Sequence, residues 1–180
     1  MGTSLTLFKL YGIEMRVHWS FLLIVAYYAF IYSGSGANPL SGAAYGVLMI
    51  LLLFLCVTLH ELGHALVAKY YKINVPNITL LPIGGVANLE RMPDKPMQEF
   101  LIAIAGPLVN IVLAAVLAPF AGLALVSAMN SGELANNTAA VWRFAQTPGL
   151  ANLVVSLAAL NLLLALFNLL PAFPMDGGRI

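Results

Sequence analysis

Two histidines and a glutamate within one apolar stretch are the residues of this sequence best suited to chemistry. They belong to the run His60-Glu61-Leu62-Gly63-His64. On a helix, side chains at i and i+4 project from the same face, so both imidazoles can bind one metal ion. Glu61 lies about 100° round the helix from His60 and can reach a water molecule there without displacing a ligand. The spacing predicts a helical metal site with an adjacent base, the arrangement of a zinc hydrolase.

A hydrolytic zinc site needs a third protein ligand and one open position. The candidates in this sequence are His18, Cys56 and a carboxylate, of which Asp176 is the strongest. Two prolines within residues 171–174 and the glycine pair after Asp176 favour an unwound chain that turns this carboxylate inward. The simpler reading of that segment is an Asp-Gly turn that leaves the membrane. Cys56 lies one turn before His60, deeper in the apolar stretch, so we expect it to be a small buried core residue. We expect His18 to lie at the membrane interface.

Asn110 and Asn168 also lie in apolar surroundings. A buried amide must form hydrogen bonds, because leaving it unpaired is costly. Each could therefore orient a metal ligand or bind a substrate carbonyl. Gly106, four residues before Asn110, allows a neighbouring helix to approach closely, and helix packing alone explains it.

The composition identifies the environment in which these residues act. Of the 180 residues, 61% are hydrophobic and only 8% are charged, about a third of the usual charged share of a soluble domain. This composition excludes an ordinary soluble globular fold and intrinsic disorder. The net charge of +1 argues against nucleic acid as a partner, and the single cysteine excludes a disulfide framework within the chain. The sequence is that of a membrane protein.

Four apolar stretches are candidates for membrane-spanning helices. They cover roughly residues 19–31, 43–68, 100–126 and 151–170, and a span needs about 20 apolar residues. The first is short, but it can extend towards Val17 and Gly34 because no charged residue lies between Arg16 and Glu61. A cleaved signal peptide is the alternative for this stretch. The pattern predicts an all-α polytopic membrane protein with about four transmembrane helices.

Two segments outside these stretches have the character of β-structure. Residues 1–18 alternate apolar and polar side chains after Tyr11-Gly12, which predicts an N-terminal hairpin whose second strand leads into the first helix. Residues 73–89 are rich in β-branched side chains and are interrupted by prolines and glycines, which no helix tolerates well. We expect a re-entrant hairpin there, at membrane depth and covered by protein or lining a water-filled cavity.

Lysine and arginine residues are divided unevenly between the two sides of a four-helix topology. Seven of them fall on one side, and only Arg143 falls on the other. The seven are Lys9, Arg16, Lys69, Lys72, Arg91, Lys95 and Arg179. Because cytoplasmic loops carry an excess of these residues, the N-terminus, the 73–89 region and the active-site end are predicted to be cytoplasmic.

Four motifs in order resemble the site-2 protease family of intramembrane zinc metalloproteases. They are HELGH at 60–64, LLPIGG at 80–85, AGPLVN at 105–110 and NLLPAFPMDGG at 168–178. The resemblance covers nearly the whole chain. It implies one zinc ion held by His60, His64 and Asp176, Glu61 as the catalytic base, and Asn168 in the active site. It also implies that the segment around Gly84 and Gly85 binds an unwound substrate as an added strand.

The resemblance predicts zinc-dependent cleavage of the transmembrane segments of membrane-anchored regulatory proteins, that is, regulated intramembrane proteolysis. The expected partners are a single-span membrane protein and the lipid bilayer. Two other classes stay open: a zinc-binding membrane transporter or metallochaperone, which would not need Glu61, and a non-catalytic membrane scaffold. Relatives with this spacing continue into two further helices and often into CBS domains, so residues 1–180 are expected to be a metalloprotease core truncated at its C-terminus.

Overall fold

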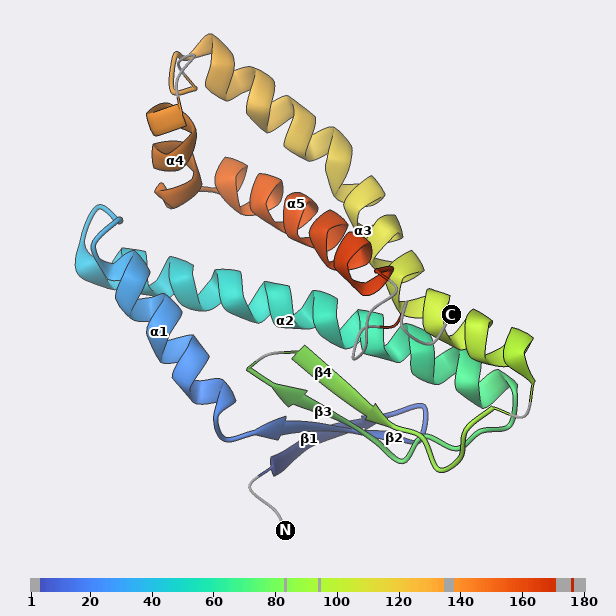
Figure 1. The fold of residues 1–180 in the computed structure, drawn as a ribbon. Coiled ribbons are helices and arrows are strands. Elements are labelled where there is room, and N and C mark those ends of the chain that lie inside the picture. The colour runs from blue at the N-terminus through green and yellow to red at the C-terminus, as the bar shows by residue number, and fades with distance from the viewer. Residues whose placement is uncertain (1–3, 83, 94, 135–137, 171–175, 177–180) are drawn as a thin grey trace.

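The computed structural model describes residues 4–82, 84–93, 95–134, 138–170 and Asp176. These residues form four strands and five helices (Figure 1). In chain order the elements are β1 (Ser4–Leu10), β2 (Ile13–His18), α1 (Phe21–Ser33), α2 (Pro39–Tyr70), β3 (Asn77–Leu81), β4 (Gly84–Asn88), α3 (Pro96–Asn130), α4 (Thr138–Gln146) and α5 (Leu150–Asn168).

The two expected hairpins are halves of one sheet. Strands β1 and β2 pair antiparallel, as do β3 and β4. Strand β2 also pairs with β3 in parallel register, from Glu14 opposite Asn77 to Val17 opposite Leu80. The sheet order is therefore β1-β2-β3-β4, with β4 at one edge. The sequence patterns predict the strands of each hairpin but contain no signal for the parallel pairing between them.

The sheet packs by one face against the C-terminal half of α2 (Figure 1). Alternate strand residues such as Ile13, Met15 and Ile78 are almost fully buried, as expected for strands with one covered face. They form a core with Ala65 and Ala68 of α2. Closer to the N-terminus of α2, a smaller hydrophobic cluster joins this helix to α5. Helix α2 is therefore covered by the sheet on one side and by helices on the other.

Within the described part of the chain, three helices are long and apolar enough to span a membrane: α2 with 32 residues, α3 with 35 and α5 with 19. The fourth apolar helix, α1, is shorter than expected. It begins at Phe21 and has 13 residues, because Ile13–His18 extends as strand β2 instead. At about 1.5 Å per residue it is about 20 Å long, less than the roughly 30 Å of a hydrocarbon core.

Glycines allow α1 and α3 to pack very closely against α2. A Cβ at Gly42 or Gly46 would overlap the carbonyl oxygen of Tyr32 or Tyr28 on α1. A Cβ at Gly63 would lie 2.9 Å from the carbonyl oxygen of Ala105 on α3. Close backbone approach through small residues is typical of helix packing in membranes. It places α3 directly beside the histidines of α2.

The short helix α4 was not predicted from the sequence. Asn152 lies in the first turn of α5, and its side chain holds the C-terminal end of α4. The Asn152 amide nitrogen donates to the carbonyl oxygens of Phe144 and Ala145, both at 2.8 Å, and of Thr147 at 2.9 Å. Carbonyls at the C-terminal end of a helix lack partners within the helix, and here the Asn152 side chain binds them and joins α4 to α5.

Candidate metal centre and active site

His60, Glu61 and His64 all lie on α2, which is continuous from Pro39 to Tyr70. Both histidines are buried, and their Nε2 atoms are 3.1 Å apart. The helical periodicity thus brings the two imidazoles to a common point, as the spacing predicts.

Asp176 approaches the same point from beyond the end of α5. Its Oδ2 atom is 3.1 Å from Nε2 of His60 and 3.1 Å from Nε2 of His64. Burial raises the pKa of the Asp176 carboxyl, but the two imidazoles beside it outweigh burial and hold this pKa well below its usual range. The side chain is therefore a carboxylate at neutral pH. The prolines and glycines expected to unwind the chain around Asp176 lie outside the described residues.

These three side chains fit a metal ion. Their ligand atoms all lie within 4.8 Å of one another, and two imidazoles with one carboxylate are a typical zinc donor set. Gly106 of α3 leaves the room that they need. A Cβ at this position would overlap Nε2 of His64 and lie 2.7 Å from Nε2 of His60. The absence of a side chain at Gly106 keeps the meeting point of the ligands open.

The second ring nitrogen of each histidine contacts α3. Nδ1 of His64 is 2.6 Å from the carbonyl oxygen of Ile102. Nδ1 of His60 is 3.1 Å from the amide nitrogen of Asn110, which is fully buried. Such outer contacts orient metal-binding histidines. Asn110 therefore lies beside a candidate ligand, one of the two roles that its sequence context suggests.

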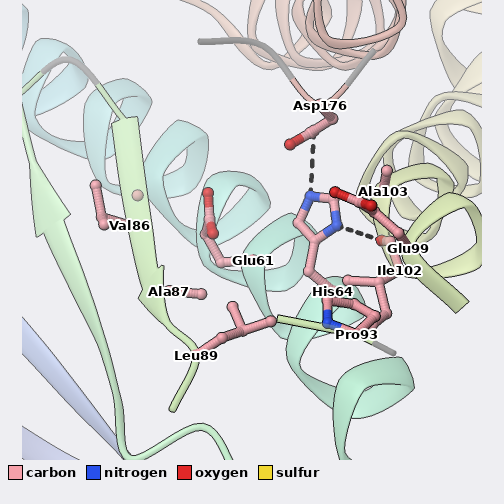
Figure 2. Close-up of a pocket in the computed structure, with 11 residues that line it drawn as sticks. Glu61, His64, Val86, Ala87, Leu89, Pro93, Glu99, Ile102, Ala103 and Asp176 are labelled. Carbon is pink, nitrogen blue, oxygen red and sulfur yellow. Dashed lines mark hydrogen bonds and ion pairs between the residues drawn. The ribbon is translucent and has the colours of Figure 1, made fainter. Parts of the chain in front are cut away.

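Glu61 lies between the ligands and the edge strand β4 (Figure 2). Gly85 of β4 is so close that a Cβ there would overlap Cγ of Glu61 and lie 3.0 Å from its Oε1. A cavity of about 200 Å³ opens beside Glu61. It is lined by residues that include His64, Val86, Glu99 and Asp176. The glutamate thus faces both the ligand cluster and a space that can hold water or a peptide.

A second cavity, of about 390 Å³, contains the other residues that the sequence singles out. Asn168, the last residue of α5, lines it together with Gly84, Gly85 and Asn110. His60, Glu61 and Asp176 line it as well. The two cavities are therefore lined by most of the candidate site residues, namely His60, Glu61, His64, Gly84, Gly85, Asn110, Asn168 and Asp176. Gly106 lies beside the two histidines.

The two alternative ligands lie elsewhere. His18 ends β2, and its Nδ1 is 2.6 Å from Oγ of Ser20. Cys56 is buried, and the amide nitrogen of Asn161 donates to its sulfur at 3.3 Å. Neither belongs to the group of described residues that could hold a metal ion.

Two parts of the site are not apparent from sequence motifs. The Ile102 carbonyl is a main-chain group, so no residue type signals its contact with His64. Glu99 lies in the first turn of α3 and lines the cavity beside Glu61. Its charge at the start of an apolar helix is the one signal that could have indicated it.

Comparison with known proteins agrees with this geometry. The family model for peptidase family M50 matches residues 48–180, which include the whole candidate site. The chain belongs to peptidase family M50. A zinc metalloprotease of Methanocaldococcus jannaschii is 37% identical over all of this chain and 45% of its own length. Stage IV sporulation protein FB of Bacillus subtilis is 31% identical over 73% of this chain and 38% of its own length.

The solved structure of a site-2 protease from Methanocaldococcus jannaschii has the same fold as this M50 chain. The two are 36% identical, with a TM-score of 0.63, over 98% of this chain and 69% of the other. With three helices long enough to span a bilayer, this likeness makes the M50 chain an integral, multi-pass membrane protein. It spans less than half the length of the two curated relatives.

Proposed function

We propose that this M50 protein is a zinc-dependent intramembrane endopeptidase. The observation that carries the proposal is the meeting of two imidazole nitrogens and one carboxylate oxygen at 3.1 Å, beside Glu61 and a cavity. We assign one zinc ion to His60, His64 and Asp176. Relatives that carry the name zinc metalloprotease support this assignment.

Glu61 is the proposed general base and acid. Zinc, when bound, polarises the scissile carbonyl and lowers the pKa of water. Glu61 takes the proton of the attacking water and then gives a proton to the leaving amine. The position of Glu61, one residue from His60 and facing the cavity, suits both transfers. The close contact of Gly85 limits the directions in which the Glu61 side chain can turn.

The proposed substrate is a transmembrane segment that unwinds before cleavage. A helical substrate has its carbonyls in internal hydrogen bonds, so it must become extended at the scissile bond. Strand β4 is an edge of the sheet and passes beside Glu61. We infer that the substrate pairs with this edge as an added strand, next to Gly84 and Gly85. Asn168 is placed to bind a substrate carbonyl or the developing oxyanion, because it lines the same cavity as Glu61.

The natural substrate class that we propose is a single-span membrane protein with a regulatory soluble domain. Cleavage near the cytoplasmic end of its span would release that domain. An edge strand next to a site that lies between long apolar helices supports this class. Membership in the subgroup that carries CBS domains stays a prediction from the sequence resemblance.

Cleavage of a model single-span peptide by the intact protein in liposomes tests the proposal. Zinc removal by a chelator should abolish cleavage, and added Zn²⁺ should restore it. Glu61→Gln should keep zinc but lower the cleavage rate by about 10²–10⁴-fold, the contribution of a general acid–base group. A purified protein without metal, or cleavage at the wild-type rate in Glu61→Gln, would refute the assignment. Zinc transport that persists in Glu61→Gln, with no cleavage by the wild type, would favour a transporter.

A further inference from the structure

The two candidate zinc-binding histidines differ in what fixes their protonation pattern. Nδ1 of His64 faces the carbonyl oxygen of Ile102 at 2.6 Å. A carbonyl oxygen only accepts hydrogen bonds, so Nδ1 of His64 carries the proton and Nε2 of the neutral ring keeps its lone pair. His64 is therefore held in the form that can bind a metal through Nε2.

His60 has no such fixed partner. Its Nδ1 faces the side-chain amide of Asn110, which has a donor end and an acceptor end. In the structure the donor end faces the ring, since Nδ2 of Asn110 is 3.1 Å from Nδ1 of His60. Nδ1 then accepts, and the proton of the neutral ring is on Nε2, where it can be donated to Oδ2 of Asp176 at 3.1 Å.

This arrangement gives both ring nitrogens of His60 a partner but leaves one atom of Asn110 unpaired. Oδ1 of Asn110 is buried and has no hydrogen-bond partner among the described residues. A half-turn of the amide would exchange Oδ1 and Nδ2 with little change in shape. Oδ1 would then accept a proton from Nδ1 of His60, and Nε2 would keep the lone pair that a metal needs.

We propose that Asn110 is a positioning residue that selects the metal-binding form of His60 through its amide oxygen. The inference rests on the proposed zinc site. Residue 110 is fully buried in α3, and its amide is the group that faces Nδ1 of His60. In this proposal the Ile102 carbonyl fixes the proton position of His64, and the rotatable amide of Asn110 sets that of His60. The two hydrogen-bond contacts of α3 with the Nδ1 atoms are then both explained.

A second buried asparagine provides a matched control. Asn161 of α5 is as fully buried as Asn110, and its Oδ1 also has no partner among the described residues. Its amide nitrogen donates to Leu157 and Cys56 and not to a candidate ligand. Asn161→Leu therefore reports what the loss of a buried amide does to this membrane fold in general.

The test measures Zn²⁺ affinity of the intact protein in detergent, by competition with a chromogenic chelator. Asn110→Leu, which keeps the size but has no acceptor, should weaken Zn²⁺ binding by about 10–100-fold, as expected for an outer partner of a ligand. Asn110→Asp, which keeps an acceptor but has no amide donor, should bind Zn²⁺ within about threefold of the wild type. Asn161→Leu should bind like the wild type.

Two outcomes would overturn the inference. Wild-type affinity in Asn110→Leu would make Asn110 a packing residue, and equal losses in Asn110→Leu and Asn110→Asp would show that the amide donor matters instead of the oxygen. If Asn110→Asp does not fold, the Zn²⁺ affinities of Asn110→Leu and Asn161→Leu are compared instead. Equal Zn²⁺ affinity of these two variants would also refute the inference. A wild-type protein that binds no Zn²⁺ would refute the zinc site itself. Failure of the zinc site is therefore distinguishable from failure of the role proposed for Asn110.

Discussion

Oδ2 of Asp176 lies 3.1 Å from Nε2 of His64, although 112 residues separate the two in sequence. The carboxylate comes from the segment after α5, and the imidazole is near the C-terminal end of α2. The proposed ligand set is therefore complete only when α5 is packed in place. A metal ion at this point would connect these distant parts of the chain.

Removal of any one ligand should cause loss of the metal. We expect His60→Ala, His64→Ala and Asp176→Asn each to lower Zn²⁺ affinity by more than the roughly 10–100-fold of an outer-contact variant, and to abolish cleavage. Asp176→Asn is the sharpest of these changes because it keeps the shape of the side chain. Metal content by elemental analysis and peptide cleavage check the result. Normal metal content and activity in Asp176→Asn would mean that this residue only shapes the turn.

A side chain at Gly106 should exclude the metal. The Cβ of Gly106→Ala would overlap Nε2 of His64, so we expect loss of Zn²⁺ and of cleavage in a folded protein. Gly122→Ala, on the same helix, is the control because a Cβ there meets nothing within 4 Å. This control should keep metal and activity, and it should raise the free energy of unfolding by up to about 1 kcal/mol through helix propensity. Equal metal content in the two variants would contradict the prediction.

A side chain at Gly85 should separate catalysis from metal binding. The Cβ of Gly85→Ala would overlap Cγ of Glu61 and turn the proposed base away, while the three ligands stay in place. We expect wild-type Zn²⁺ content with cleavage reduced by about 10²-fold or more, the lower range for loss of a general base. Unchanged cleavage would show that Glu61 can move freely beside β4.

The positions of the site residues could be predicted to different degrees. The spacing of His60 and His64 requires only a helix, and the apolar run around them indicates one. The approach of Asp176 depends on how α5 packs against its neighbours, which no local pattern encodes. The sequence therefore indicates Asp176 only through the weakness of the other candidate ligands and through the family resemblance. The Ile102 carbonyl gives no signal in a sequence, because every residue has the same group.

The strands show a similar limit. Alternation predicts that Ile13 and Met15 share one buried face, and both are buried. It does not predict which strand lies next to β2, because a parallel partner can come from any distance along the chain. The shortness of α1 follows from the same pairing, since residues 13–18 are held in the sheet and cannot extend the helix.

The uneven distribution of lysine and arginine residues predicts how the protein is oriented across the membrane. In a Cys56→Ser background, which removes the sole cysteine, Met92→Cys should react with a membrane-impermeant thiol reagent only from the cytoplasmic side. Arg143→Cys should react only from the opposite side, because α4 lies beyond the other end of α3. Both positions are exposed. Labelling of residue 143 from the cytoplasm would reverse the predicted topology.

The parallel pairing of β2 with β3 also constrains the order of assembly. The two strands are about 60 residues apart, and helices α1 and α2 lie between them. Closing so long a connection is entropically costly and slow compared with local hairpin formation. We therefore expect β3 and β4 to dock on β2 only after α2 has been inserted into the bilayer. A nascent chain would then contain the His60 and His64 pair before it has a finished edge strand beside Glu61, so peptide-cleaving competence would be acquired late in biogenesis.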